Sequence, residues 1–342
     1  MRREALECAR TVRDQADLAR EPLAALVRRW QAQPPSLMLT VARGSSDHAA
    51  QYLGYLAMLR LGLPTLSLPM SLPTLHQAPL QVQGQWAIAL SQSGGSPDLV
   101  LAMQALAARG AHTVSWVNQA ASPLEAACQN HLPLGAGPER SVAATKSYLA
   151  ALALGARWVA ALAQDAALAS ALQALPDDLD AAAAAQNGAG AWADTAVPVL
   201  QGAERIMVVG RGLGLAVALE AALKFKETCA IQAEAFSGAE IRHGPMALIG
   251  ALYPLLIFAP RGPEQAGLLQ FAADMRQRGA AVLLAAPADV PERELTLSTA
   301  HDALLDPLLA VQGFYLMVET LARARGRDPD APPFLNKVTL TH

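Results

Sequence analysis

Three ionisable side chains share one face of a predicted helix in the second half of the chain. Glu220, Lys224 and Glu227 stand at positions i, i+4 and i+7, which aligns them along an α-helix. Two carboxylates and an ammonium in a row could move a proton between neighbouring carbons of an aldose–ketose pair. A solvated surface with an ordinary Glu–Lys pair is the alternative. The helix directly follows the glycine-rich turn of residues 210–214, which favours a functional role.

A turn rich in serine and glycine lies between a predicted strand and a predicted helix. Its residues are Ser91, Gln92, Ser93, Gly94, Gly95 and Ser96. A helix N-terminus attracts anions through its free N–H groups and its dipole, and small hydroxyl residues add donors. The pattern therefore indicates a phosphate site, although an ordinary turn capped by Ser96 would look similar. No Gly-Lys-Ser/Thr follows, which argues against a P-loop NTPase.

Two further segments could line the same site. Residues 43–46, Arg-Gly-Ser-Ser, follow another predicted strand and could reach the same edge of a parallel sheet, or could be a simple capped turn. Residues 141–146 are predicted to open an alanine-rich helix over residues 141–162. That segment could also be only a helix start, with Lys146 solvated.

A histidine and the C-terminal tail complete the candidates. His243 stands between charged residues and a Gly-Pro break, so it is predicted in a loop. Its ordinary pKa suits proton transfer near neutral pH, although a lone loop histidine is more often incidental. The tail is apolar, and Phe334, Leu335 and Val338 are expected to dock, either as lid packing or to bring Lys337 to a site.

The elements that must position these residues repeat along the chain. Arg43 and Arg211, each followed by glycine, lie 168 residues apart, and Arg109 and Arg278 lie 169 apart. This offset indicates a duplicated unit and an α/β fold with two tandem doubly wound parallel-sheet subdomains, each of three α/β/α layers. The second copy lacks hydroxyl groups over residues 259–264, so one phosphate site per chain is expected.

The chain is predicted to divide into five parts. Residues 1–35 form an N-terminal helical segment, and residues 36–165 form the first subdomain with the phosphate loop. A helical linker over residues 166–195 leads to the second subdomain, residues 196–330, with the catalytic helix and the histidine loop, and residues 331–342 form a tail over the active site. Strands are expected within residues 36–46, 84–96, 111–117, 204–212, 251–262 and 280–286, with helices between them.

Composition limits the possible functions. The 342 residues suggest about two domains, and 53% hydrophobic against 16% charged residues can fill large cores. A net charge of −3 argues against nucleic-acid or membrane-surface partners. The three cysteines are far apart, which argues against a disulfide framework or a zinc site. The first twenty residues are too charged for a signal peptide, and a cytoplasmic location is expected.

Five motifs occur in a fixed order: LSQSGGS, SVAATKS, LEAALKFKE, AEAFSGAEIRHGP and LNKVT. Together they resemble the sugar isomerase (SIS) family, from about residue 20 to the end. The similarity is to the isomerase half of glucosamine-6-phosphate synthase and to its relatives, which include glucosamine-6-phosphate deaminases, agaS-like isomerases and fructosamine deglycases.

The resemblance implies a role for each matching residue. The substrate-binding positions are Ser46, Ser91, Gln92, Ser93 and Ser96 for the phosphate and its surroundings, and Val142 for a backbone contact with the sugar.

The catalytic positions come from the same resemblance. Glu227 would carry the proton between C1 and C2, with Glu220 and Lys224 as its partners on the helix. His243, contributed by the neighbouring subunit of a homodimer, would assist ring opening. Lys337 matches the tail lysine that forms an imine with the ketose in the synthase.

The departures from the synthase decide the expected reaction. Because the sequence begins Met1-Arg2, the glutaminase domain with its N-terminal cysteine is not expected in this protein. The expected reaction converts glucosamine 6-phosphate to fructose 6-phosphate and ammonia, without a metal or redox cofactor. The alternatives are a fructosamine-phosphate deglycase, another aldose–ketose sugar-phosphate isomerase, and a non-catalytic module that senses sugar phosphates.

Overall fold

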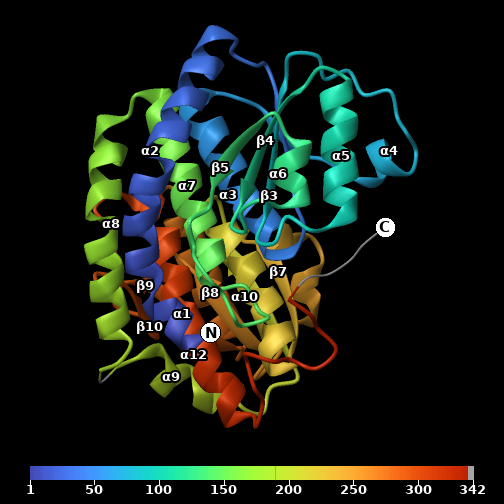
Figure 1. The fold of residues 1–342 in the computed structure, drawn as a ribbon. Helices are drawn as coiled ribbons and strands as arrows, with labels where there is room; N and C mark the ends of the chain where they lie inside the picture. The colour runs from blue at the N-terminus through green and yellow to red at the C-terminus, as the bar shows by residue number, and fades with distance from the viewer. Residues whose placement is uncertain (189, 338–342) are drawn as a thin grey trace. The chain divides into compact units, whose positions relative to one another are not determined.

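The computed structural model describes residues 1–188 and 190–337 and divides the chain into two units (Figure 1). The N-terminal unit comprises Arg10–Glu139, Lys146–Leu172 and, of the described tail, Asn336 and Lys337. The C-terminal unit comprises Met1–Ala9, Arg140–Thr145 and Gln173–Leu335. Each unit is built around its own sheet.

The N-terminal unit holds five parallel strands in the order β2-β1-β3-β4-β5. Their bounds are β1 Met38–Val41, β2 Thr65–Ser67, β3 Trp86–Ser91, β4 His112–Val117 and β5 Asn130–Pro133. Every residue of β1 and β3 is buried. Such continuous burial is typical of strands in a parallel sheet that helices cover on both faces.

Helices cover both faces of this sheet (Figure 1). They are α2 Cys8–Ala32, α3 Gly44–Leu61 and α7 Lys146–Ala163 on one face, and α4 Ser71–Thr74, α5 Pro97–Ala108 and α6 Pro123–Ala127 on the other. Alternate strand side chains supply the two cores. Ala87 and Ala89 pack toward Met103 and other residues of α5, whereas Trp86 packs against Trp30 of α2, with ring centroids 4.8 Å apart.

The C-terminal unit holds five parallel strands in the order β10-β9-β8-β6-β7. Their bounds are β6 Arg205–Gly210, β7 Gln232–Ser237, β8 Pro254–Phe258, β9 Ala281–Pro287 and β10 Leu295–Leu297. Counted from its own first strand, this order equals that of the other sheet. The constant offset of 168–169 residues therefore corresponds to one strand order built twice.

The second sheet is also covered on both faces. Its helices are α9 Trp192–Leu200, α10 Gly214–Cys229, α11 Gln265–Gln277 and α12 Asp306–Ala324. Phe271 of α11 belongs to the core of one face. On the other face, Phe225 of α10 packs edge-on against Phe314 of α12, with ring centroids 5.2 Å apart. The remaining helical elements are α1 Arg2–Leu6, α8 Ala166–Ala185, η1 Glu240–His243, η2 Pro245–Leu248 and η3 Ala303–Leu305.

The predicted fold class, with two doubly wound parallel sheets flanked by helices, is confirmed. One described helix, Ala303–Ala324, is long and apolar enough to cross a membrane by length and composition, but 89% of its apolar window is buried inside the protein. A core helix of a soluble protein passes the same test.

The predicted helix over residues 141–162 is wrong at its start. Residues 141–145 are irregular, and α7 begins at Lys146. The cause is local hydrogen bonding by two carboxylates. Glu139 accepts from the Ser147 N–H at 3.0 Å in the first turn of α7, and Glu4 accepts from the Ser141 N–H at 3.1 Å. Lys146 is buried, which also rules out the solvated position considered for it.

The prediction that Phe334 and Leu335 dock is wrong within the described residues. Phe334 is fully exposed and Leu335 is 44% exposed, so neither side chain docks within the chain. Phe334 has a left-handed backbone (φ 66°), which marks a turn. Pro332 is buried instead, and Val338 lies outside the described residues.

Candidate functional site

The order of the first sheet creates a switch point between β1 and β3. Strand order reverses there, and doubly wound sheets bind ligands at such a point, beyond the carboxyl ends of the strands. Val41 pairs with Ala89, so β1 and β3 end close together. The turns that follow them are the two that the sequence singled out, around Ser46 and over residues 91–96.

The turn over residues 91–96 is shaped by hydrogen bonds from serine side chains. Ser91 Oγ accepts from the Gly94 N–H at 2.9 Å, and Ser93 Oγ accepts from the Gly95 N–H at 3.2 Å. Ser96 is the N-cap of α5. Ser91 is 8% exposed, while Gln92 and Ser93 are half-buried. The turn thus presents half-buried hydroxyl groups beside a helix N-terminus.

Gly94 is required by the shape of this turn. Its φ of +64° lies in the left-handed region, which glycine adopts without penalty. A Cβ at this position would lie 2.3 Å from Ser122 Oγ and 2.8 Å from a Val117 methyl group. Ser122 cannot easily withdraw, because its Oγ accepts from the Glu125 N–H as the N-cap of α6.

The turn after β1 carries the other candidate of this unit. Ser46 lies in the first turn of α3 and is half-buried, and its N–H donates to the Arg43 carbonyl at 3.1 Å. The guanidinium of Arg43 reaches across to the start of α5, where Nη2 donates to Asp98 Oδ2 at 2.9 Å. An ion pair therefore joins the two turns at the switch point.

The tail lysine also lies in the N-terminal unit. Lys337 Nζ donates to Glu139 Oε2 at 2.7 Å, and the same oxygen accepts from Ser147 Oγ at 2.8 Å. The Glu139 side chain is fully buried, whereas that of Lys337 is 25% exposed. A buried carboxylate at the N-terminus of α7 thus holds the lysine ammonium in place.

The structure places Val142 in the C-terminal unit, within the irregular segment before α7. Val142 is half-buried, and its N–H donates to the Asp330 carbonyl at 3.1 Å. A sugar contact through this N–H would have to compete with that bond.

The three ionisable residues of α10 form one connected cluster. Lys224 Nζ pairs with Glu220 Oε1 at 3.4 Å and donates to Glu227 Oε2. The Glu220 and Lys224 side chains are fully buried, and that of Glu227 is 21% exposed. Tyr315 of α12 donates its hydroxyl to Glu220 Oε1 at 2.9 Å. The surface alternative is therefore wrong, because only the last member of the row reaches solvent.

Burial and charge act in opposite directions on Lys224. Burial alone would lower the pKa of Lys224, but the carboxylates of Glu220 and Glu227 more than offset this effect and raise it above the ordinary value of 10.5. Lys224 is therefore an ammonium at neutral pH. Its contacts hold the carboxylates of Glu220 and Glu227 on either side of one cation.

His243 is the last residue of η1, directly after β7. It is exposed, as the predicted loop position requires. Within the described residues, no hydrogen bond or ion pair links His243 to the α10 cluster. Also among the described residues, no group of three or more His, Cys, Asp or Glu side chains could hold a metal ion.

Comparison with known proteins identifies the family of this chain. Residues 36–161 and 199–288 match the SIS domain. The chain belongs to the SIS domain family. The resemblance expected from the five ordered motifs is thereby confirmed.

Relatives of this SIS domain chain are metabolic proteins. A glutamine–fructose-6-phosphate aminotransferase (isomerizing) of Aeropyrum pernix is 36% identical over 322 residues, which are 88% of this chain and 50% of the relative. The chain spans about half the length of the curated relatives it matches. It is thus related to isomerising aminotransferases over a portion of their length.

Two solved structures show the same SIS architecture. A protein of Silicibacter pomeroyi, provisionally described as a phosphosugar isomerase, has a TM-score of 0.88 and 38% identity, covering 96% of this chain and 99% of that one. A glucosamine-6-phosphate deaminase of Thermotoga maritima has a TM-score of 0.72 and 20% identity, covering 97% and 99%. At 20% identity the likeness shows the fold alone.

The structure adds residues to the candidate site that the sequence of this SIS chain did not single out. Glu139 carried no signal in the sequence beyond its charge, and neither did Asp98 or Tyr315. Their partners lie 198, 55 and 95 positions away along the chain. A spacing rule finds neighbours on one helix and cannot find such long-range pairs.

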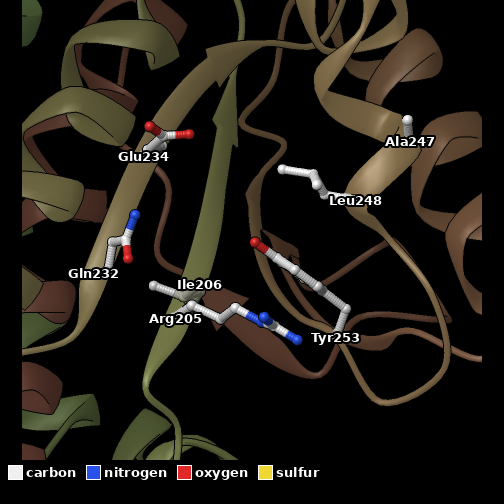
Figure 2. A pocket seen from close by; sticks show the side chains of 7 residues that line it. All are labelled: Arg205, Ile206, Gln232, Glu234, Ala247, Leu248 and Tyr253. Carbon is white, nitrogen blue, oxygen red and sulfur yellow. The ribbon is translucent and has the colours of Figure 1, made fainter.

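The SIS chain also has a cavity of about 470 Å³ that belongs to a different region (Figure 2). It is lined by Arg205, Ile206, Gln232, Glu234, Ala247, Leu248 and Tyr253. Arg205 and Gln232 begin β6 and β7, so the cavity lies toward the amino ends of these strands. Doubly wound sheets bind ligands beyond the carboxyl ends of their strands, and this cavity is therefore not the candidate site.

Proposed function

We propose that this chain moves a proton between C1 and C2 of an amino-sugar phosphate, and that it converts glucosamine 6-phosphate to fructose 6-phosphate and ammonia. The observation that carries the proposal is the α10 cluster. Its buried ammonium holds two carboxylates, and only Glu227 reaches solvent. A carboxylate oriented by a fixed cation and open on one side is suited to act as a general base.

The proposed steps follow from the chemistry of the substrate. The phosphate binds at residues 91–96 with Ser46, and His243 assists opening of the pyranose ring to the aldehyde. Glu227 removes the proton from C2 and returns it to C1, while O1 gains a proton and the amine nitrogen loses one. The C1 aldehyde thereby becomes an alcohol and the C2 amine becomes an imine. Water adds to this C2=N bond, and ammonia leaves to give the ketose.

The relatives support the class of reaction. The Aeropyrum pernix relative is named as an isomerising aminotransferase of fructose 6-phosphate, and the Silicibacter pomeroyi structure is described as a phosphosugar isomerase. Both names fit C1–C2 chemistry on a phosphorylated sugar. The choice of glucosamine 6-phosphate and the release of ammonia are this proposal's own.

An assay of ammonia release over a panel of amino-sugar 6-phosphates tests the proposal. Glu227→Gln should lower kcat by about 10²- to 10⁴-fold with KM nearly unchanged, since a general base contributes that much. Glu234→Gln on β7 is the matched control, because it makes the same change at an exposed carboxylate in the cavity away from the switch point. Near-normal turnover in Glu227→Gln would remove Glu227 from the role.

The assay also separates the alternatives. Interconversion of ketose and aldose phosphates without ammonia would indicate a plain isomerase. Release of an amino acid from a glycated substrate would indicate a deglycase. Binding of sugar phosphates without turnover of any of them would indicate a sensing module.

We further propose that the active form is a homodimer in which His243 serves the partner's site. Its exposure, and its lack of a bond to the α10 cluster among the described residues, are compatible with that arrangement. Mixing inactive His243→Ala and Glu227→Gln proteins tests it. Regained ammonia release would support shared sites, whereas no gain after verified subunit exchange would place both groups in one chain's site.

A further inference from the structure

The switch point of the first sheet carries a positive charge in addition to its hydroxyl groups. Arg43 ends the turn after β1 and is the N-cap of α3. Asp98 lies in the first turn of α5, two residues after Ser96. Because β1 and β3 are neighbouring strands, the guanidinium of Arg43 lies beside the turn over residues 91–96.

The carboxylate of Asp98 fixes one edge of this guanidinium. Arg43 Nε and Nη2 both donate to Asp98 Oδ2, at 3.2 and 2.9 Å. Asp98 Oδ1 accepts from the Leu99 N–H at 2.9 Å. The Asp98 side chain is 5% exposed and that of Arg43 is 59% exposed. The helix thus holds the buried carboxylate of Asp98, and the exposed guanidinium of Arg43 keeps N–H groups on its outer side.

We propose that Arg43 binds the phosphate of the substrate directly and that Asp98 positions it. The inference rests on the proposed function, because it takes residues 91–96 as the phosphate site. Arginine offers paired N–H groups in one plane, which match the oxygens of a phosphate, and its charge offsets that of a dianion. The ligand class is a phosphomonoester dianion or inorganic phosphate.

The other unit offers a matched control pair. Arg261 follows β8, the counterpart of β3, and its Nε and Nη2 donate to the Asp306 carboxylate at 2.8 and 2.7 Å. Asp306 is buried at the start of α12, with 2% of its side chain exposed, while Arg261 is 38% exposed. The ion pair has the same chemistry, but residues 259–264 contain no hydroxyl group. Arg261→Gln therefore removes an arginine–carboxylate pair outside the proposed site, together with the hydrogen bond from Arg261 Nη2 to the Ala300 carbonyl.

Titration with inorganic phosphate at constant pH and ionic strength provides the test. Binding is measured by calorimetry on the wild type, Arg43→Gln, Arg43→Lys and Arg261→Gln. Loss of a charge-assisted hydrogen bond should weaken phosphate binding about tenfold to a hundredfold in Arg43→Gln. Arg43→Lys should lie between this variant and the wild type. Arg261→Gln should bind phosphate as the wild type does.

A fifth variant separates direct binding from an indirect effect. Arg43→Gln leaves the buried Asp98 carboxylate unpaired, and this charge could itself repel phosphate or unsettle the turn. Arg43→Gln/Asp98→Asn removes both charges, so it should melt closer to the wild type while its phosphate affinity stays low. Recovery of wild-type affinity in this double variant would overturn the proposal.

The remaining outcomes are equally decisive. Unchanged phosphate affinity in Arg43→Gln would overturn the role of Arg43 and leave the proposed phosphate turn standing. Equal losses in Arg43→Gln and Arg261→Gln would show a general effect of a broken ion pair and would also overturn it. No phosphate binding by the folded wild type would overturn the phosphate site itself, and with it the role of Arg43.

Discussion

Lys224 holds two carboxylates that would otherwise repel each other inside the C-terminal unit. Its ammonium is fully buried, and so is the carboxylate of Glu220. An unpaired buried charge is far more costly than a buried pair. The cluster therefore couples the stability of α10 to the orientation of Glu227.

Removing the ammonium should destabilise the protein strongly. Lys224→Met leaves Glu220 buried without its cation and should lower the free energy of unfolding by about 3–5 kcal/mol. Glu220→Gln/Lys224→Met should recover much of this loss. Urea unfolding of both variants measures the difference, and a loss below about 1 kcal/mol in the single variant would contradict the buried pairing.

The pH dependence of this contribution has a definite sign. The folded-state pKa of Lys224 is raised above its ordinary value of 10.5, so its stabilisation is complete below about pH 10 and declines as the pH rises through the folded-state pKa. The stability difference between the wild type and Glu220→Gln/Lys224→Met should therefore stay constant from pH 6 to about pH 9. A difference that declines near neutral pH would contradict an ammonium at this position.

The cysteines should be unreactive while the protein is folded. Burial raises the pKa of Cys128 to about 12 and that of Cys229 to about 11, and Cys8 is buried. Because the thiolate is the reactive form, a thiol reagent at pH 8 should label the native protein slowly. After unfolding in urea it should label all three cysteines quickly. Fast labelling of the native protein would show that these sites open readily.

At the scale of the element, the turn between β3 and α5 depends on one glycine. Gly94→Ala would need a left-handed backbone and would place a Cβ against Ser122. The turn should therefore shift, and phosphate binding should weaken at least tenfold as its donors move. Gly137→Ala is the control, since it also replaces a left-handed glycine (φ +65°) but meets no atom within 4 Å. Equal phosphate affinities for both variants would show that the close contact does not matter.

Glu139 joins the start of α7 to the tail. Glu139→Gln keeps a similar shape but removes the charge that holds Lys337. Trypsin should then cleave after Lys337 several-fold faster than in the wild type, because an anchored side chain resists entry into a protease. Cleavage after Lys226, an exposed lysine of α10, is the internal reference. A rise at both sites would indicate general loosening and would contradict a local anchor.

The sequence predicts elements better than their ends. Six of the ten described strands were predicted, because buried parallel strands are short apolar runs, and the turn over residues 91–96 was predicted because its hydroxyl and glycine residues are adjacent. The strands β2, β5, β7 and β10 were missed, because they are only three or four residues long or carry polar residues. The start of α7 was misplaced because Glu4 binds the Ser141 N–H in the preceding segment and Glu139 binds the Ser147 N–H in the first turn of the helix. Glu4 lies 137 positions before Ser141, so no local pattern reveals its contact.

At the scale of the whole molecule, the repeat offset predicted two sheets of one design. The structure confirms this, with the same strand order in both. The division into units was less predictable. The chain leaves the N-terminal unit after Glu139 and returns at Lys146, and no change in composition marks that excursion. Long-range partners such as Asp98 and Tyr315 were not predicted either, because residue pairs that are distant in the sequence leave no periodic pattern.

The tryptophans are divided unevenly between the units. Of the five tryptophans in the chain, Trp30, Trp86, Trp116 and Trp158 lie in the N-terminal unit, with neighbouring ring centroids 4.8 to 5.9 Å apart. Only Trp192 lies in the C-terminal unit. Indole emission is thus dominated by one half of the protein, and rings this close should couple their electronic transitions. A melt followed by fluorescence would report that half, and a mismatch with far-ultraviolet dichroism would reveal that the halves unfold separately.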